Sequence, residues 1–289
     1  MGLAEYPIMV VVVAYGIEDQ LASCLDALGP GLPVVIVDNG SSERARQVCL
    51  SAGATYVRPA SNIGFAAAVN LAVHDHRRDG CDVLLLNPDA RLLPSDLALM
   101  REQFLRQRDL AATGPRLVNP DGSSQKSEWP MPSPWTALAS VIGVADRVIR
   151  RRFVGGAALL LRGDAIDAVG TLDEQYFLYA EESDWQLRAV RAGWRVGVTP
   201  GATAVHTSGA TSSDQDRREL LFNASAERFI RKWYGTFGWQ VFRAASIIAG
   251  LRRLAFASGG KQSKATHVRA ITHYWRGPVR YANAIGDTP

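Results

Sequence analysis

The sequence predicts an α/β fold in which a mainly parallel sheet is flanked by helices and is followed by a helical C-terminal extension. Short apolar runs rich in β-branched residues, such as 8–13 and 34–37, alternate with helical patterns through the first third of the chain. Strands that are apolar on both faces and that alternate with helices are typical of a parallel sheet covered on both sides. After residue 214 every segment has a helical pattern.

The individual elements follow from apolar spacing and from helix or strand breakers. Strands are predicted at 8–13, 34–37, 55–57, 83–86, 153–161 and 195–198, and the run 153–161 is interrupted by Gly155-Gly156. Helices are predicted at about 21–28, 42–52, 64–77, 94–108 and 181–192. Asn119-Pro120-Asp121-Gly122 is a turn signal. Residues 129–135 contain three prolines, which predicts an irregular, mobile loop over a site.

The bulk composition is that of a folded protein. The 289 residues are 47% hydrophobic and 21% charged, which suits one large domain or one domain with an appendage. The cysteines, Cys24, Cys49 and Cys81, are odd in number and far apart, so we expect buried thiols in a reducing compartment. The N-terminus has no basic region before its short apolar run, so no secretory signal is expected and a cytoplasmic location is predicted.

Positive charge is concentrated at the C-terminal end. From Arg217 onward there are 13 Lys/Arg and 3 Asp/Glu, against 19 and 25 in the preceding part. This region also carries many aromatic residues, and two explanations stay open. The helices lie on an anionic membrane surface, which would make the protein peripheral on the cytoplasmic face, or they pack against the body or against a second subunit of a homodimer. No recognition motif supports nucleic acid as a partner.

Polar side chains follow three of the predicted strands. Tyr15 follows the first strand, Asp38 ends the second, and Asp89 follows the fourth. Ligands of open parallel sheets bind beyond the C-terminal ends of the strands. An aromatic face, a hydrogen-bond acceptor and a metal-binding carboxylate suit a nucleotide diphosphate. A second reading of Asp38 and Asp89, as turn and helix-capping residues only, stays open.

Other nucleotide and hydrolase motifs are absent from the sequence. No Gly-x-Gly-x-x-Gly follows the first strand, no phosphate-loop pattern with the required spacing occurs, and no Gly-x-Ser-x-Gly elbow is found. Dehydrogenases, P-loop enzymes and serine hydrolases are therefore disfavoured.

Three carboxylates lie within four positions in the run Glu181-Glu182-Ser183-Asp184. Acids in the first turn of a helix interact favourably with its free N–H groups, which is a structural explanation. A carboxylate held among other carboxylates and aromatic rings can instead have its pKa raised and act as a general base. Asp184 and Arg188 are four residues apart and are expected to pair on one helix face.

Six motifs in a fixed order resemble family-2 inverting glycosyltransferases, and most of all their bacterial rhamnosyltransferase-like branch. They lie at 12–15, 38–41, 62–70, 86–89, 154–157 and 172–188. The resemblance covers about residues 8 to 210. It implies a GT-A type fold, in which a Rossmann-like nucleotide-binding half is merged with an acceptor-binding half.

The resemblance also implies roles on the donor side. It assigns the pyrimidine base to Tyr15 and Asp38 and puts Asn62 near the nucleotide pocket. Asp89 fills the place of the metal-binding acid for Mg²⁺ or Mn²⁺, and His206, expected just after the last strand, completes the metal site. Asn87 stands where many members have an Asp, which lowers the local negative charge.

On the acceptor side, the resemblance implies that Glu181 and Glu182 occupy the place of the family's Glu-Asp pair. The second member, Glu182, is then the predicted catalytic base, while the role of Glu181 stays open. Tyr179, Trp185 and Gly156 are predicted to shape the acceptor pocket.

The predicted organisation is a GT-A catalytic domain over 1–213 and a basic helical region over 214–289. Residues 1–115 form its nucleotide-sugar-binding half and 116–213 its acceptor-binding half. The expected activity is inverting transfer of a sugar from a nucleotide diphosphate to a hydroxyl of a glycan or lipid-linked glycan, in cell-envelope polysaccharide assembly. The first donor expected is dTDP-L-rhamnose, and a UDP-hexose donor used on a different acceptor is the alternative. A sugar nucleotidyltransferase and a non-catalytic nucleotide-sugar-binding scaffold are the rivals from other classes.

Overall fold

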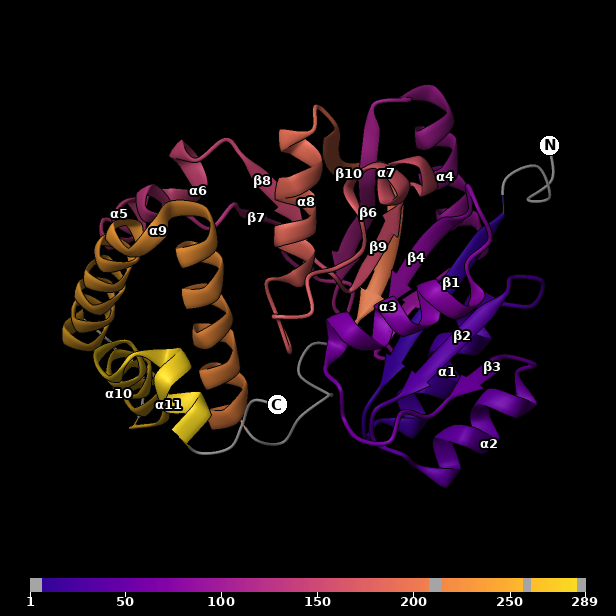
Figure 1. Ribbon diagram of the computed structural model, residues 1–289, viewed down its shortest axis with the longest axis horizontal. Helices are drawn as coiled ribbons and strands as arrows, with labels where there is room; N and C mark the ends of the chain where they lie inside the picture. The colour runs from indigo at the N-terminus through magenta and orange to yellow at the C-terminus, as the bar shows by residue number, and fades with distance from the viewer. Residues whose placement is uncertain (1–6, 208–214, 257–260, 285–289) are drawn as a thin grey trace. The chain divides into compact units, whose positions relative to one another are not determined.

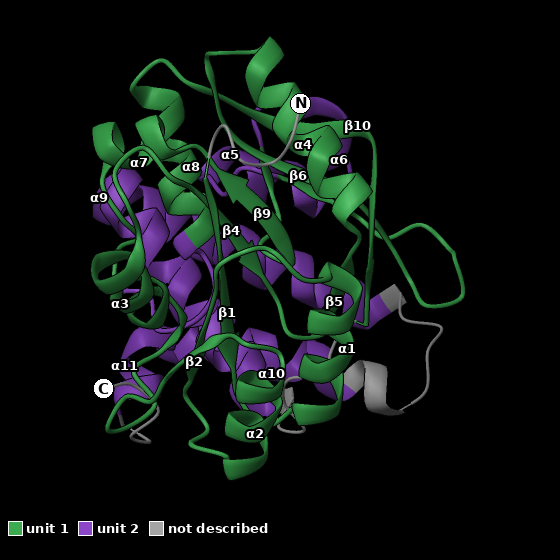
Figure 2. Ribbon diagram, turned by 90° about the vertical axis from the view of Figure 1, so that its right-hand side faces the viewer, with its two compact units in different colours: residues 1–129, 153–174, 182–213 green, residues 130–152, 175–181, 214–289 purple. Residues whose placement is uncertain are grey.

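A computed structural model describes residues 7–207, 215–256 and 261–284 (Figure 1). Two predictions fall outside the described residues. They are the domain boundary at 213/214 and the absence of a secretory signal in the first six residues. The chain forms two compact units (Figure 2). Unit 1 comprises 1–129, 153–174 and 182–213, and unit 2 comprises 130–152, 175–181 and 214–289. The domain boundaries predicted from the sequence stay predictions.

Unit 1 is built on an eight-stranded mixed sheet with the strand order β3-β2-β1-β4-β9-β6-β10-β5. The strands β9 and β5 run antiparallel to their neighbours, and the other six share one direction. The strands are β1 (Ile8–Ala14), β2 (Val34–Asp38), β3 (Thr55–Val57), β4 (Asp82–Leu86), β5 (Ala90–Leu92), β6 (Leu110–Val118), β9 (Ala158–Leu161) and β10 (Arg195–His206). The sheet is therefore mainly parallel, as predicted.

Helices cover both faces of this sheet because its central strands are apolar on both sides. Every residue of β1 is buried, and its residues alternate between two cores. Val10 and Val12 pack with α1, α2 and α4, while Val11 and Val13 pack with α3, α7 and α8. The helices are α1 (Glu18–Leu28), α2 (Glu43–Ser51), α3 (Phe65–His76), α4 (Pro94–Arg106), α7 (Gly163–Val169) and α8 (Glu181–Arg191).

The polar segments of unit 1 converge at one edge of the sheet. Ala14 pairs with Asp38 at the ends of β1 and β2, and Leu86 ends β4. Because β9 and β5 run in the opposite direction, they begin at this edge. Leu86 pairs with Ala158, and Ala90 pairs with His206.

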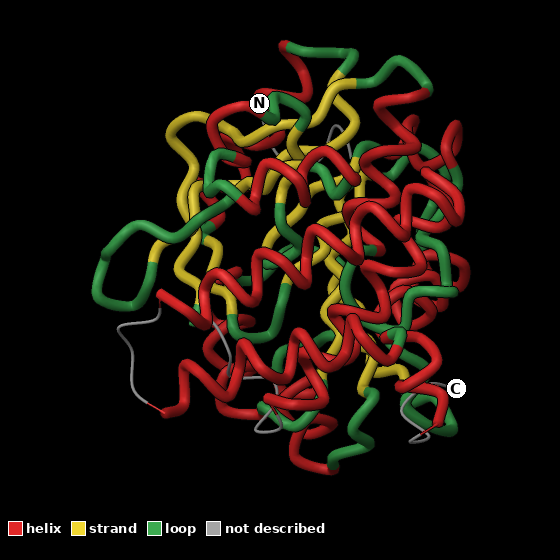
Figure 3. Tube along the Cα trace, turned by 90° about the vertical axis from the view of Figure 1, so that its left-hand side faces the viewer, coloured by secondary structure: helices red, strands yellow, loops and turns green. Residues whose placement is uncertain are grey.

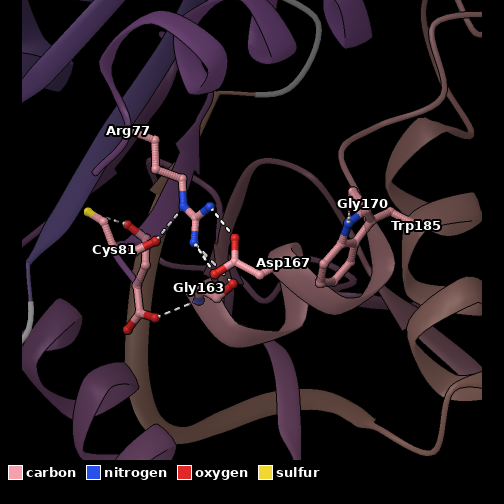
Figure 4. A network of polar contacts seen from close by, with 7 residues as sticks. Arg77, Cys81, Gly163, Asp167, Gly170 and Trp185 are labelled. Atoms are coloured by element: carbon pink, nitrogen blue, oxygen red, sulfur yellow. Dashed lines mark hydrogen bonds and ion pairs between the residues drawn. The ribbon is translucent and has the colours of Figure 1, made fainter. Parts of the chain in front are cut away.

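The opposite edge is held by a polar network of its own (Figure 4). Arg77, which follows α3, forms an ion pair with Asp167 at 2.6 Å and donates to the carbonyl oxygens of Cys81 and Gly163. Asp82, at the start of β4, accepts from the Gly163 N–H at 2.8 Å. These contacts fasten α3 and α7 to β4 at the end remote from the polar edge.

Unit 2 is mainly helical (Figure 3). The long helix α9 packs against α5, α10 and α11, and Gly235 breaks its regular geometry. Trp239 is buried and its ring packs with those of Phe242 and Tyr274, so part of the C-terminal aromatic content forms a core within the unit. The helices are α5 (Pro134–Val141), α6 (Ala145–Val148), α9 (Gln215–Phe256), α10 (Lys261–Arg276) and α11 (Pro278–Ala284). Among the described segments, no helix is both long and apolar enough to cross a membrane.

Several predicted elements needed correction. The segment 129–135 is not wholly irregular, because β7 (Glu128–Pro130) pairs with β8 (Arg152–Val154) and α5 begins at Pro134. Proline is well accommodated in the first turn of a helix, where its missing N–H has no partner to lose. The last predicted strand is longer than 195–198, so His206 ends β10 instead of following it. The interruption at Gly155-Gly156 and the burial of the three cysteines are confirmed.

Candidate active site

Asp38 is fully buried at the end of β2 and organises the turn that follows. One carboxylate oxygen accepts from the Gly40 N–H at 2.9 Å, and the other accepts from the Ser42 N–H and from the Tyr56 hydroxyl, both at 2.8 Å. Burial first, and then this hydrogen bond, raise the pKa of Tyr56 to about 12. Asp38 therefore organises the turn, and its role in binding a base stays a prediction. A carboxylate has about four lone-pair positions, and these hydrogen bonds fill three of them.

Tyr15 and Asn62 flank Asp38. Tyr15 follows β1 and is 42% exposed, which leaves its ring accessible. Asn62 accepts from the Gly64 N–H at 3.0 Å, just before α3. Asn39 ties this loop to β2, because its Nδ2 donates to the Gly64 carbonyl at 3.1 Å. The three predicted base-side residues therefore lie on connected loops at the polar edge.

Asn87, Asp89 and His206 form the next part of this edge. The Asn87 N–H donates to the Ala157 carbonyl at 2.9 Å, which links the end of β4 to the start of β9. Asp89 is buried, and its Oδ1 lies 3.4 Å from His206 Nε2. The Thr207 N–H also donates to the Asp89 carbonyl at 3.0 Å. The structure thus brings the two predicted metal ligands side by side.

Asp89 and His206 suit a divalent cation that is bound together with a diphosphate. Within the described residues, Asp89 Oδ1 is buried and has no hydrogen-bond partner, which is the state expected of a ligand oxygen. No group of three or more His, Cys, Asp or Glu side chains suited to a metal occurs in the part of the chain that the structure describes. Mg²⁺ is commonly bound through one or two carboxylates together with substrate phosphates and water, so a two-residue site suffices.

Glu182 lies in the first turn of α8, facing the break between β8 and β9. A Cβ added to Gly156 would lie 3.8 Å from Glu182 Cγ, so the glycine leaves room beside the carboxylate. In the described residues, Glu182 Oε2 is buried without a hydrogen-bond partner. Burial raises the pKa of Glu182, and backbone N–H groups at the helix start oppose that rise only in part. A raised pKa suits a general base.

Gln186 fixes the position of this helix relative to β8. It is fully buried, donates from Nε2 to the Val154 carbonyl, and accepts from the Val154 N–H, both at 2.8 Å. Val154 is followed directly by Gly155-Gly156. The paired hydrogen bonds therefore set the distance between the glycine pair and Glu182, one helical turn earlier.

The residues just before α8 have an unusual backbone. Tyr179 and Ala180 have φ values of 69° and 71°, in the left-handed region that disfavours residues with a side chain. Two such residues in succession store strain, which is found chiefly at functional sites. Within unit 2 the Tyr179 ring packs edge-on against Phe222, with 5.7 Å between centroids, and Glu181 is buried. The acceptor role of Tyr179 and the role of Glu181 stay predictions.

Asp184 and Trp185 are structural residues. Asp184 is fully buried and pairs with Arg188 at 3.1 Å, as predicted. The prediction that Trp185 shapes the acceptor pocket is wrong. Its side chain is 1% exposed within the core beneath α3 and α7, and its Nε1 donates to the Gly170 carbonyl at 2.7 Å (Figure 4). Trp185 is therefore part of the apolar core on this side of the sheet and does not line an open pocket.

Three residues at the site were missed from the sequence: Tyr56, Gln125 and Gln186. Tyr56 contacts Asp38, Gln125 contacts His206, and Gln186 holds β8. The only signal for Tyr56 in the sequence was its place in a short predicted strand, where side chains alternate between the two faces of the sheet. The glutamines act across 81 and 32 residues of sequence, so no local pattern marks them.

Comparison with known proteins bears on this geometry. A family model described as glycosyl transferase family 2 matches residues 9–162. The chain is 26% identical over 230 residues to an N-acetylglucosaminyl-diphospho-decaprenol L-rhamnosyltransferase of Mycobacterium tuberculosis. That match covers 69% of this chain and 75% of the relative.

Solved structures resemble the fold. The mannosyltransferase PcManGT from Pyrobaculum calidifontis, in complex with GDP-Man and Mn²⁺, aligns with a TM-score of 0.56 and 13% identity over 96% of this chain and 83% of that one. Glucosyl-3-phosphoglycerate synthase from Mycobacterium tuberculosis, in complex with Mn²⁺, UDP and glucosyl-3-phosphoglycerate, aligns with a TM-score of 0.57 and 13% identity over 78% and 80%. The predicted GT-A type fold is confirmed.

Proposed function

The chain belongs to glycosyl transferase family 2, and from this premise we propose that it transfers a sugar, with inversion, from a nucleotide diphosphate to a hydroxyl of a glycan or lipid-linked glycan. The similarity to a rhamnosyltransferase whose name includes a diphospho-decaprenol acceptor supports a lipid-linked acceptor in cell-wall assembly. It also favours dTDP-L-rhamnose as the first donor to test. A UDP-hexose is the alternative, because contacts from Tyr15 and Asp38 to a pyrimidine base do not by themselves separate thymine from uracil.

One observation carries this proposal. In the described residues of unit 1, two buried carboxylate oxygens lack a hydrogen-bond partner, and they belong to Asp89 and Glu182. Leaving a buried acceptor unsatisfied costs about 1–3 kcal/mol, and more for a charged group. Both acids lie at the polar edge, next to Asn87 and Gly156 respectively, which flank Ala157. Two buried carboxylate oxygens without a partner among the described residues suit a site in which Asp89 binds a cation and Glu182 binds a proton.

The residues have distinct roles in the proposed reaction. Glu182 takes the proton from the acceptor hydroxyl while that oxygen bonds to the anomeric carbon, opposite the bond to the diphosphate. That bond breaks, and its electron pair leaves with the diphosphate. Asp89 and His206 would hold Mg²⁺ or Mn²⁺, which supplies positive charge to the leaving group when it is bound. Tyr15 and Asp38 orient the base, and Asn87 offers an amide beside the ribose or a metal-bound water.

A thermal-shift screen tests donor and metal binding together. We expect one nucleotide sugar among dTDP-L-rhamnose, UDP-glucose, UDP-galactose and UDP-galactofuranose to raise the melting temperature in the presence of Mn²⁺. At a concentration of 100 times Kd, the ligand stabilises the fold by about 2.7 kcal/mol. For a chain of this size that is a rise of roughly 5–10 °C. Asp89→Ala should lose the part of the shift that depends on Mn²⁺.

Turnover separates the transferase from its rivals. A transferase releases the nucleoside diphosphate only when the acceptor is present, and a nucleotidyltransferase would instead make a nucleotide sugar from a sugar phosphate. Binding of a donor without release on any lipid-linked or free glycan would favour the scaffold. A Mn²⁺-dependent shift that survives in Asp89→Ala would refute the metal assignment.

A surface of unit 2 suits contact with the membrane that holds a lipid-linked acceptor. We define this basic and apolar surface by its exposed side chains on α5, the residue after α5, α6, the segment after α6, and α9: Trp135, Ile142, Arg147, Val148, Arg150, Ile248, Leu251, Arg252 and Arg253. The helices α5 and α9 pack together, and Arg252 donates to the Val141 carbonyl at the end of α5. Aromatic and apolar side chains mixed with arginines favour the interface of an anionic bilayer.

Vesicle binding tests this surface. We expect co-sedimentation with vesicles that contain anionic lipid, weaker binding to purely zwitterionic vesicles, and loss of binding in the pair Trp135→Glu and Leu251→Glu. The matched control is Leu50→Glu, at an exposed apolar position in unit 1. If the pair of variants instead converts a dimer to a monomer without any effect on vesicle binding, the surface is a subunit interface and the membrane proposal is wrong.

A further inference from the structure

The turn that follows β6 reaches back to the metal-binding edge. The Asn119 N–H donates to the Ser123 carbonyl at 2.8 Å, and the Gln125 N–H donates to the Leu117 carbonyl at 2.8 Å. Val118 of β6 pairs with Val205 of β10. This closed turn therefore returns the chain beside the end of β10, where the next residue is a histidine. The sequence alone marked 119–122 only as a turn.

Gln125 makes three hydrogen bonds that fix the orientation of its amide. Its Nε2 donates to the His206 carbonyl at 2.7 Å and to Asn119 Oδ1 at 2.6 Å. Both partners are oxygens that only accept, so the amide nitrogen must face them. Gln125 Oε1 then faces His206 Nδ1 at 3.0 Å. An oxygen that only accepts requires a proton on that ring nitrogen.

The orientation of Asn119 is fixed in turn by Asp121. The Ser123 hydroxyl donates its single proton to the Asp121 carboxylate at 2.6 Å, and Ser123 Oγ accepts from Asn119 Nδ2 at 2.8 Å. These side-chain and backbone hydrogen bonds from Ser123 lower the pKa of Asp121, so it stays an acceptor. Asn119 Oδ1 is thereby directed at Gln125. The donor and the acceptor are therefore fixed in each hydrogen bond of the series that runs from Asp121 through Ser123, Asn119 and Gln125 to the His206 ring.

We propose that Asn119 and Gln125 are positioning residues that hold neutral His206 in the tautomer with its proton on Nδ1 and its lone pair on Nε2. This inference rests on the proposed metal site, because the Nε2 lone pair is then the ligand that faces Asp89 Oδ1 across 3.4 Å. It also accounts for the fact that, among the described residues, Asp89 Oδ1 accepts no hydrogen bond. Asp89 and His206 would then offer two acceptor atoms that could hold a cation.

The other tautomer would close the site. With its proton on Nε2, His206 would donate to Asp89 Oδ1, and the internal hydrogen bond would compete with the metal for both ligands. In metal sites, the hydrogen bond at one ring nitrogen of a histidine sets which nitrogen is free to bind the metal. Gln125 supplies that hydrogen bond here through its amide oxygen.

Nitrogen NMR of the metal-free protein reads the tautomer directly. Ring-labelled [¹⁵N]histidine protein is observed at about pH 8.5, well above the ordinary histidine pKa of about 6.5. The His206 signals are identified by their loss in His206→Gln. We expect the wild-type ring to carry its proton on Nδ1. A proton on Nε2, or on both nitrogens, overturns the proposal, whatever the variants do.

Variants of Gln125 test the cause. Gln125→Met removes the acceptor and should shift the ring toward the Nε2–H tautomer, while Gln125→Glu keeps an acceptor and should retain the Nδ1–H form. Ser124→Ala, in the same turn but outside the hydrogen-bond series, is the matched control and should match the wild type. A wild-type tautomer in Gln125→Met would show that this residue does not set it.

Titration with Mn²⁺ alone, followed by electron paramagnetic resonance, supplies a second readout. Loss of such a supporting hydrogen bond typically weakens metal binding 10- to 100-fold, and we expect a weakening of about this size in Gln125→Met with recovery in Gln125→Glu. If Asp89→Ala and His206→Gln leave Mn²⁺ binding unchanged, the proposed metal site is wrong. The tautomer measurement stands apart from that failure, because it needs neither metal nor turnover.

Discussion

Replacing Glu182 by glutamine should separate activity from stability. The structure gives the acid a buried oxygen without a hydrogen-bond partner, within the described residues, and burial raises its pKa. The amide has nearly the same shape, so the site keeps its form, but it cannot accept the proton of the acceptor hydroxyl. A positioned general base contributes about 10²–10⁴ in rate. At about 1.36 kcal/mol for each factor of ten, the barrier should rise by about 2.7–5.4 kcal/mol.

The same substitution should leave the free energy of unfolding at pH 7 equal to that of the wild type or raise it. A carboxyl whose pKa is raised in the folded state holds its proton more tightly there than in the unfolded chain. The wild-type free energy of unfolding therefore falls as pH rises from the ordinary glutamate pKa to the raised one. Glutamine does not ionise, so this decline disappears. Its amide oxygen can also accept from the backbone N–H groups at the start of α8.

Two assays check this prediction. Initial rates of nucleoside diphosphate release measure the loss of turnover, and the thermal shift with the donor should be retained. Chemical unfolding at pH 4 and pH 7 measures the pH dependence of stability. Near-normal turnover, or a variant that is less stable than the wild type at pH 7, would refute the reasoning.

A matched control lies two residues away on the same helix. Asp184 is fully buried and paired with Arg188. Breaking a buried pair by removing one partner costs about 3–5 kcal/mol. Asp184→Asn should therefore lose stability, while the correctly folded fraction keeps its turnover per molecule. The two variants should show opposite patterns.

Four further variants test the local packing and the raised pKa of Tyr56. Gly155→Ala would bring a Cβ to 2.4 Å from a ring atom of Trp129 and should destabilise the fold by about 1–3 kcal/mol in denaturation experiments. Gly156→Ala meets only ordinary contacts, so it should keep the stability of the fold while reducing acceptor use in transfer assays. Trp185→Phe should lose about 1–3 kcal/mol of stability from its lost hydrogen bond and leave the KM for the acceptor unchanged in transfer assays. A raised KM for the acceptor would restore a role at the site. Burial and the hydrogen bond to Asp38 raise the pKa of Tyr56 to about 12, so its contribution to stability should be lost as pH rises from about 10 toward 12, and Tyr56→Phe should reduce that decline in thermal melts.

Much of the sheet could be predicted because its strands are defined by local composition. The apolar runs at β1, β2 and β4 are buried on both faces, and that pattern is visible without any knowledge of the partners. β6 was missed because Gly114-Pro115 interrupts it. A Cβ on Gly114 would come within 2.5 Å of Val154, so the glycine is required by a neighbour that lies far away in the sequence. Strand direction is equally non-local, which is why the short strand β5 and the reversed direction of β9, within the predicted run 153–161, were not predicted.

The candidate site was predictable to the extent that its residues follow strand ends. Asp38 and Asp89 could be located in this way, and the structure brings Asp89 and His206 together. The face of α8 could not be assigned from its sequence alone. Trp185 is adjacent to the acidic run in sequence, yet a helix turns by about 100° per residue, so neighbours point in different directions. Assigning it to a pocket required knowing which side of the helix meets the sheet.

The two cores that share β1 have a consequence for how such chains diverge. The residues that hold the fold lie in the strands and on the inner faces of the helices, while those proposed for chemistry lie at or just beyond the strand ends and in the first turn of α8. Substitutions in those segments can accumulate at little expense in folding energy. A chain of this architecture can therefore acquire a different sugar preference without rebuilding its scaffold. The fold shared with glucosyl-3-phosphoglycerate synthase at 13% identity shows that the scaffold itself also tolerates wide substitution when its apolar pattern is kept.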